Sequence, residues 1–166
     1  MRPYLTRLQA IDLLLLRALR TRVHGPLAER AVIRFSRLGD HATVWLVVSC
    51  LGAVVGPERR VYRRAGLTVT AMLALNYATK LSIRRARPLL EDLPPLSPTT
   101  SSLSYPSAHA STSFACARVL CDVLPPGLVY GLAAAIGLSR PYLGIHYPSD
   151  VVAGAAFGTL VAGRLR

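Results

Sequence analysis

The sequence has few acidic residues, a single lysine and no apolar run of membrane-spanning length. Of its 166 residues, 20 are Lys or Arg and 8 are Asp or Glu, so the formal net charge is +12. A membrane-crossing helix needs about 20 apolar residues, and no uninterrupted run reaches that length. The N-terminus also lacks a clean apolar core followed by small residues, which argues against a cleaved signal peptide.

Patterns for disulfides, metals and nucleic acids are missing as well. The 3 cysteines form no CxxC pair and no metal-type spacing with histidine, so we interpret them as small core residues. No acidic pair or histidine cluster is left to hold a metal, and we expect neither a metal nor another cofactor. Basic residues do not alternate with aromatic residues, so nucleic acid is not an expected partner. No repeat or linker divides the chain, which predicts one domain over residues 1–166.

The sequence does contain a high proportion of apolar residues. Hydrophobic residues make up 52% and charged residues 17%, with a mean hydropathy of +0.38, which is high for a soluble domain. Five uncharged runs cover residues 41–57, 65–79, 93–117, 123–139 and 151–163. Each run is short for a span, but Arg and Lys at the ends can extend their charges to the membrane interface. We therefore predict an all-α, polytopic membrane helix bundle of about five spans; a soluble helical bundle is the alternative.

The N-terminal region has a different pattern from the rest. Residues 4–20 and 27–38 mix apolar and basic positions at helical spacing, which predicts amphipathic helices that lie in the interface. Residues 1–38 would thus be interfacial and residues 40–166 would form the transmembrane core. The spans are expected at residues 40–56, 63–82, about 107–124 and 127–139, and from about residue 149 onward.

Two smaller patterns lie within this core. The proline- and serine-rich segment 88–106 cannot form a regular helix and is expected to be a loop that covers a site. Gly52 with Gly56, and Gly154 with Gly158, form GxxxG patterns that let helix backbones approach closely.

Alternation of the spans predicts where polar side chains gather. The end of the second span, the start of the third, the end of the fourth and the start of the fifth must lie at one face. The polar residues at these four ends are Lys80, Arg84, Arg85, Arg87, Ser107, His109, Ser139, Arg140, His146 and Asp150. Such a cluster has cations to neutralise an oxyanion, histidines to attack or transfer protons, and a carboxylate to orient one of them.

Three segments of this region resemble known signatures. The segments KLSIRRARP (80–88), PSAH (106–109) and SRPYLGIHYPSD (139–150) resemble the K-x6-RP, PSGH and SR-x5-H-x3-D patterns of the type 2 phosphatidic acid phosphatase family. They match in residue type, order and spacing, except that Ala108 replaces a glycine. The resemblance covers residues 80–150 and implies a metal-independent membrane phosphatase that acts on phosphomonoesters or diphosphates.

The resemblance also suggests a role for each residue. His146 would be the nucleophile that forms a phosphohistidine, Asp150 would hold its tautomer, and His109 would protonate the leaving oxygen. The phosphate would be bound by Lys80, Arg87, Ser107, Ala108, Ser139 and Arg140. For Ala108 we expect a negative φ at a helix start, so that its N–H can serve the phosphate.

Other polar residues are interpreted as lying outside the chemistry. Arg84 and Arg85 are expected to face lipid headgroups. His24, His41 and Asp40 are expected to be interfacial or capping residues.

Features of the sequence that are less specific than the three motifs favour one substrate. The small size, the arginine-rich ends and the PSAH variant resemble most the actinobacterial members that remove the 5-phosphate from decaprenylphosphoryl-5-phosphoribose, an arabinan precursor in cell wall biosynthesis. Undecaprenyl diphosphate, phosphatidylglycerol phosphate and phosphatidate are the alternative substrates. A non-catalytic membrane scaffold is the alternative of another class, and the intact set of motif residues disfavours it.

The charge distribution predicts orientation and neighbours. The active face carries 13 basic residues against 6 opposite, and still 10 against 6 without Lys80, Arg87 and Arg140. The positive-inside rule then places the active site toward the cytosol in a multi-pass protein of the cell (inner) membrane. We expect anionic lipids as neighbours, and a homo-oligomer or a complex with a prenyl-transferring membrane enzyme would cover the remaining apolar surface.

Overall fold

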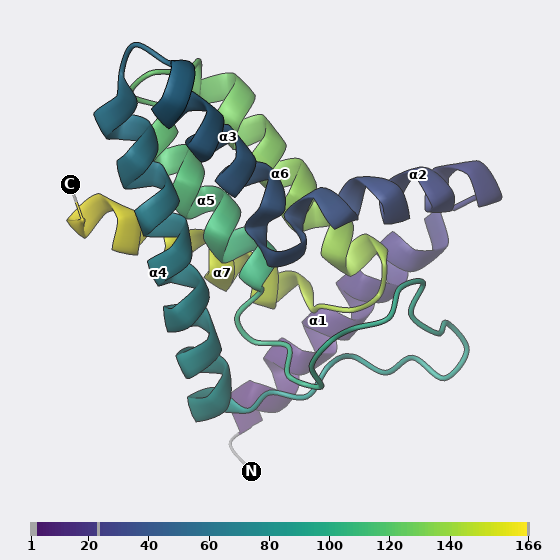
Figure 1. The fold of residues 1–166 in the computed structure, drawn as a ribbon. Helices are drawn as coiled ribbons and strands as arrows, with labels where there is room; N and C mark the ends of the chain where they lie inside the picture. The colour runs from purple at the N-terminus through teal and green to yellow at the C-terminus, as the bar shows by residue number, and fades with distance from the viewer. Residues whose placement is uncertain (1–2, 23, 166) are drawn as a thin grey trace.

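The computed structural model describes residues 3–22 and 24–165, and these residues form helices joined by loops (Figure 1). The helices are α1 (Pro3–Arg22), α2 (Pro26–Ser36), the 3-10 helix η1 (Arg37–Ala42), α3 (Thr43–Val55), α4 (Arg59–Ile83), α5 (Ala108–Leu120), α6 (Pro126–Tyr142) and α7 (Pro148–Arg164). Within this part of the chain there is no strand beyond one isolated bridge between Ala86 and Leu103. The all-α prediction is confirmed.

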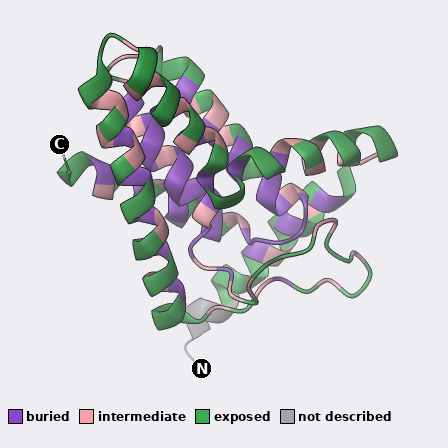
Figure 2. Ribbon diagram, viewed as in Figure 1, coloured by how far each residue is buried: buried purple, intermediate pink, exposed green. Residues whose placement is uncertain are grey.

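Helix α5 is the centre of the bundle. It packs against α4, α6 and α7, and α3 packs against α4 and also contacts α5. Most residues of α5 are buried, from His109 and Ala110 to Val119 and Leu120, whereas the outer faces of α2 and α4 are exposed (Figure 2). Small side chains dominate α5, and they let its neighbours come close on several sides.

The outside of the bundle is apolar. Among the described residues, large hydrophobic side chains that are 40% exposed or more occur on every α-helix except α5. They include Leu51 and Val55 on α3, Leu67 on α4 and Leu160 on α7. A water-soluble monomer rarely exposes so much apolar surface, whereas a membrane protein places it against lipid.

The helices are shorter than the predicted spans in two places. Helices α3 and α5 have 13 residues each, which is about 20 Å at 1.5 Å per residue and less than the ~30 Å hydrocarbon core. By length and hydropathy, one segment among the described residues could cross a membrane, Pro26–Val55. It comprises α2, η1 and α3, and its backbone is non-helical at Asp40 and His41. Five spans are therefore not confirmed.

The bend in η1 follows from close contact with α5. A Cβ atom at Gly39 would overlap the His109 ring and Ile136. The chain then turns through positive φ at His41 (51°) and Ala42 (59°) before α3 begins. Glycine at residue 39 thus lets the α2–α3 connection lie directly on the start of α5.

The predicted loop and the predicted N-terminal helix lie side by side across one end of the bundle (Figure 1). Residues 84–107 contain no helix, as expected. Arg17 of α1 binds Asp92 of the loop through two hydrogen bonds of 2.8 and 2.7 Å. Arg20 of α1 donates to the carbonyl of Pro94 at 2.7 Å. Helix α1 is therefore attached to the loop.

Candidate active site

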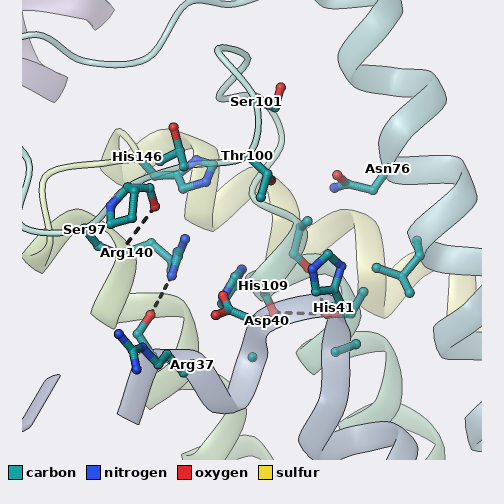
Figure 3. Close-up of a pocket in the computed structure, with 18 of the residues that line it drawn as sticks. Arg37, Asp40, His41, Asn76, Ser97, Thr100, Ser101, His109, Arg140 and His146 are labelled. Carbon is teal, nitrogen blue, oxygen red and sulfur yellow. Dashed lines mark hydrogen bonds and ion pairs between the residues drawn. The ribbon is translucent and has the colours of Figure 1, made fainter. Parts of the chain in front are cut away.

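His146 lies in the short loop between α6 and α7. The loop is held by backbone hydrogen bonds from Leu143 to Ser139 (3.0 Å) and from Ile145 to Arg140 (3.2 Å). Gly144 turns the chain with φ of 76°, a conformation that glycine adopts without strain. This turn aims the buried His146 side chain back into the bundle, where it lines a pocket (Figure 3).

The contacts of the His146 ring define its protonation. Nε2 lies 3.2 Å from Nη1 of Arg87, and a guanidinium can only donate. Nδ1 lies 3.5 Å from Oδ2 of Asp150, so the ring proton belongs on Nδ1 and the lone pair on Nε2. Burial lowers the pKa of His146 to about 3. The imidazole is therefore neutral at physiological pH, with its nucleophilic nitrogen beside Arg87.

Asp150 lies in the first turn of α7, which begins at Pro148. Proline at this position needs no hydrogen-bond partner and has a suitable φ for a helix start. Oδ2 of Asp150 accepts the backbone N–H of Tyr147 at 3.0 Å, and the side chain is fully buried. The 3.5 Å separation from His146 is long for a hydrogen bond, so in this structure the carboxylate orients the ring mainly by charge.

Three cations surround the same pocket. Nζ of Lys80 donates to the carbonyl oxygens of Leu103 and Ser104, at 3.1 Å from each. Arg87 donates to the carbonyl of Ile145 at 2.6 Å, and burial lowers its pKa. Arg140, near the end of α6, donates to Oγ of Ser36 at 2.6 Å. The three come from different elements, and together they make the pocket positive.

The second histidine stands at the start of α5. Its Nε2 lies 3.2 Å from Oδ1 of Asp40, and both residues line the pocket (Figure 3). Ala108, the first residue of α5, also lines the pocket. It is not among the described non-glycine residues with positive φ, as expected for a helix start.

The pocket has a volume of about 680 Å³. Its walls come from α2 and η1, α4, the loop residues 96–101, and the ends of α5 and α6. Asn76 of α4 and several hydroxyl groups of the loop line it together with the charged residues. The prediction that segment 88–106 covers a site agrees with this arrangement.

The structure brings together most of the predicted site residues but not all of them. The wall of the pocket includes Lys80, Arg87, Ala108, His109, Arg140 and His146. Ser107 instead caps α5, where its Oγ accepts the N–H of Ala110. Ser139 is not in the wall of the pocket; its Oγ donates to the carbonyl of Ile136 at 2.6 Å and lies 2.9 Å from Oγ of Ser36. Both serines are buried, and their predicted contact with phosphate stays a prediction.

Other residues near the site were interpreted wrongly from the sequence. Arg85 does not face headgroups: it binds Asp150 and Asp12 at 2.8 and 2.7 Å. Asp40 is not a simple cap, because it pairs with His109, and His41 lines the pocket beside it. His24 does lie outside the pocket, stacked on Tyr142. Alternation of the spans could have predicted that Asp40 and His41 lie near the site, since the start of the first span must share a face with the end of the second.

Comparisons with known proteins agree with this geometry. Residues 61–165 match the PAP2 superfamily. The chain is 38% identical over 130 residues to the decaprenylphosphoryl-5-phosphoribose phosphatase of Mycobacterium tuberculosis. The aligned region covers 76% of this chain and 72% of the relative.

Two solved structures share the fold. One is Aquifex aeolicus LpxE, with a TM-score of 0.81 and 25% identity over 93% of this chain and 94% of that one. The other is the transmembrane PAP2-type phosphatidylglycerolphosphate phosphatase of Bacillus subtilis, with a TM-score of 0.76 and 25% identity over 96% and 84% of the two chains. The chain therefore belongs to the PAP2 superfamily and is a membrane phosphatase.

Proposed function

We propose that the chain removes the 5-phosphate from decaprenylphosphoryl-5-phosphoribose through a phosphohistidine. The observation that carries the chemistry is the neutral His146 ring, whose Nε2 lies 3.2 Å from Arg87 in a pocket that Lys80, His109 and Arg140 also line. The similarity to the mycobacterial phosphatase supports the substrate, because it extends over three quarters of the chain.

The reaction follows from the placement of the two histidines. Nε2 of His146 attacks phosphorus while the bond from phosphorus to the ribose 5-oxygen breaks. His109 donates a proton to that oxygen as it leaves, so the lipid-linked ribose departs as an alcohol. His109, now neutral, takes a proton from a water molecule, which attacks the phosphohistidine and releases inorganic phosphate. The second step restores both histidines.

The cations supply the electrostatic part of catalysis. The phosphoryl group gains negative charge at its equatorial oxygens in the transition state, and Lys80, Arg87 and Arg140 lie around the pocket where that charge develops. Removing one such group typically costs about 3 to 4 kcal/mol of transition-state stabilisation. Because the three residues come from separate elements, the site depends on the correct packing of the bundle.

The shape of the pocket supports a sugar phosphate on a lipid tail. Its volume of about 680 Å³ lies within the usual range for small-molecule sites. Asn76, Thr100 and Ser101 offer polar groups to sugar hydroxyls, and Leu73 and Tyr77 of α4 continue the wall. Tyr77 is 63% exposed, so this side provides a route for a polyprenyl chain toward lipid. Phosphatidylglycerol phosphate is the second candidate, favoured by the likeness to the Bacillus subtilis structure.

Phosphate release from purified protein in detergent tests this function. We expect turnover of decaprenylphosphoryl-5-phosphoribose in the presence of a chelator, above that of prenyl diphosphates, phosphatidylglycerol phosphate and phosphatidate. His146→Ala should lower kcat by about 1000-fold or more, because the nucleophile is gone. His24→Ala is the matched control, since His24 lies outside the pocket, and it should retain activity.

Two results decide against the proposal. Equal activity of wild type and His146→Ala on every substrate would exclude the nucleophile. A preference for phosphatidylglycerol phosphate would keep the mechanism and replace the substrate.

We also propose that the active face lies toward the cytosol, in line with its excess of basic residues. That orientation suits a lipid phosphate made inside the cell. It further suits contact of the arginine-rich ends with anionic lipids.

A further inference from the structure

A buried carboxylate of α1 reaches the start of α7. Asp12 is only 4% exposed, although most of the described side chains of α1 are exposed. Its Oδ1 accepts the backbone N–H of Ser149 at 2.9 Å, and its Oδ2 accepts the Ser149 hydroxyl. Asp12 thus caps the helix that carries Asp150, from a position 137 residues earlier in the chain.

Arg85 joins this carboxylate to Asp150. One nitrogen of its guanidinium, Nη2, donates to Oδ2 of Asp12 at 2.7 Å. The other, Nη1, donates to Oδ1 of Asp150 and to Oγ of Ser149, both at 2.8 Å. The flat group also lies over the Tyr147 ring, 4.0 Å from its centroid. These contacts with Asp12, with Asp150 and Ser149, and with the Tyr147 ring fix the orientation of the planar guanidinium.

The two oxygens of Asp150 have different partners as a result. Arg85 occupies Oδ1, while Oδ2 faces Nδ1 of His146 at 3.5 Å. Rotation of the carboxylate would therefore break the contact with Arg85 or move Oδ2 away from the histidine. The orientation of His146 depends on Asp150, that of Asp150 on Arg85, and that of Arg85 on Asp12.

Attachment of α1 does not explain this arrangement. Helix α1 is already bound to the loop by Arg17 with Asp92, and by Arg20 with the carbonyl of Pro94. The Arg17–Asp92 pair is more than half exposed on both sides, as is usual for a surface tether. Arg85 is only 26% exposed and Asp150 fully buried, so their ion pair carries a larger desolvation cost and a stricter geometry.

We propose that Asp12 and Arg85 are positioning residues, which act through Asp150 to hold His146 in the tautomer that presents Nε2 to the phosphate. This inference rests on the proposed function, in which His146 is the nucleophile. It adds the N-terminal helix to the catalytic machinery, although that helix precedes the region matched to the family, residues 61–165.

The first test compares two equivalent changes on the ion pairs of α1. Asp12→Asn should lower kcat by about 10- to 100-fold, the usual effect of losing an orienting partner, and leave KM within about twofold. Asp92→Asn removes a carboxylate from the other α1 ion pair and should leave both constants unchanged. Asp12→Glu, which keeps the charge, should recover part of the lost kcat.

Arg85→Lys provides a second variant should Asp12→Asn fold poorly, which thermal unfolding in detergent would reveal. An ammonium keeps the charge but cannot hold two carboxylates with one planar fork, so kcat should fall as it does for Asp12→Asn. The double variant should be little worse than either single one, because both changes break the same chain of contacts.

A second readout does not need turnover. Nitrogen-15 NMR of labelled histidine should show the proton on Nδ1 of His146 in the wild type and in Asp92→Asn, and a mixture of tautomers in Asp12→Asn and Arg85→Lys. Unchanged ring-nitrogen signals in these two variants would overturn the proposal, whatever happens to kcat. So would an equal loss of kcat in Asp12→Asn and Asp92→Asn.

The two proposals can fail separately. If the wild type releases no phosphate from any lipid substrate, the proposed function fails, and the tautomer of His146 still decides whether Asp12 and Arg85 position it.

Discussion

At the scale of single residues, each of the two histidines faces a carboxylate, and the two carboxylates are held differently. Asp150 is fully buried and is fixed by the backbone of Tyr147 and by Arg85. Asp40 is 51% exposed on its side chain, and its contact with His109 is 3.2 Å. His146 is thus held rigidly, whereas His109 is paired at the edge of the pocket, where water competes.

The Asp40–His109 contact leads to a prediction about the leaving group. Asp40→Asn should lower kcat on the lipid substrate by about tenfold, a smaller effect than the 10²–10⁴-fold typical of losing a general acid. The reason is that a neutral amide in place of the carboxylate would no longer favour the charged, proton-donating form of His109. With p-nitrophenyl phosphate, whose leaving group needs no proton, the variant should equal the wild type. Equal losses on both substrates would show a general defect of the pocket and contradict the role.

The motif residues could be predicted at this scale, but their partners could not. The spacing within three short segments and the alternation of spans placed His146, His109 and the three cations of the pocket at one face. Asp40 is 69 residues from His109, and Arg85 is 73 residues from Asp12. Ion pairs between such distant positions leave no periodic signal in the chain. A lone Arg or Asp near an interface therefore resembles a headgroup contact or a cap until packing is known.

At the scale of helices, α5 and α7 come closest together, and glycine permits it. A Cβ atom at Gly158 would overlap the carbonyl oxygen of Ser111, and one at Gly154 would lie 2.7 Å from the carbonyl oxygen of Ser107. This GxxxG pattern therefore lets two helices of the same chain approach, as predicted. The pattern in α3 differs: Gly52 makes room for the ring of Tyr62. Close α5–α7 packing sets the distance between the helix starts that carry His109 and Asp150.

Alanine at two glycines should have unequal effects. Gly158→Ala should lower the thermal unfolding temperature in detergent, since overpacking against backbone typically costs about 1 to 3 kcal/mol. Activity should fall with it, because the two helices must move apart. Gly131→Ala is the control: it lies within α6 with no atom within 4 Å of an added Cβ, and alanine favours helix by about 1 kcal/mol. Its unfolding temperature should stay level or rise. A loss at Gly131 equal to that at Gly158 would contradict the packing argument.

Helix starts were easier to predict than helix lengths. Proline at Pro126 and Pro148 marks the starts of α6 and α7, where a missing N–H costs nothing. The break between α2 and α3 was predicted near residue 39, between segments 27–38 and 40–56, but the contact of Gly39 with His109 that shapes it was not. The third span was predicted to end at about residue 124, but α5 stops at Leu120 and the chain turns over residues 121–124 before Pro125.

At the scale of the whole molecule, charge and apolar surface are distributed unequally. The outer faces of the bundle carry exposed leucines and valines, while arginines gather at its two ends. The end with the pocket includes Arg37, Arg84 and the α1 arginines, and the opposite end includes Arg59, Arg60, Arg63 and Arg64. This distribution fits a bundle that lies across a membrane with its pocket at one interface, and the excess on the pocket side favours the cytosol.

Cysteine labelling tests the proposed orientation in both directions. In a background without Cys50 and Cys121, the two cysteines that are not buried, Glu91→Cys marks the loop beside the pocket and Glu58→Cys marks the turn between α3 and α4. Both positions are exposed. Glu58 directly precedes α4, and Glu91 lies in the loop that follows it. In the proposed orientation the pocket end faces the cytosol, so in intact spheroplasts a membrane-impermeant maleimide should label Glu58→Cys and should label Glu91→Cys only after permeabilisation. The reverse pattern would place the active site outside, and the substrate would then be a lipid phosphate exposed on the outer leaflet.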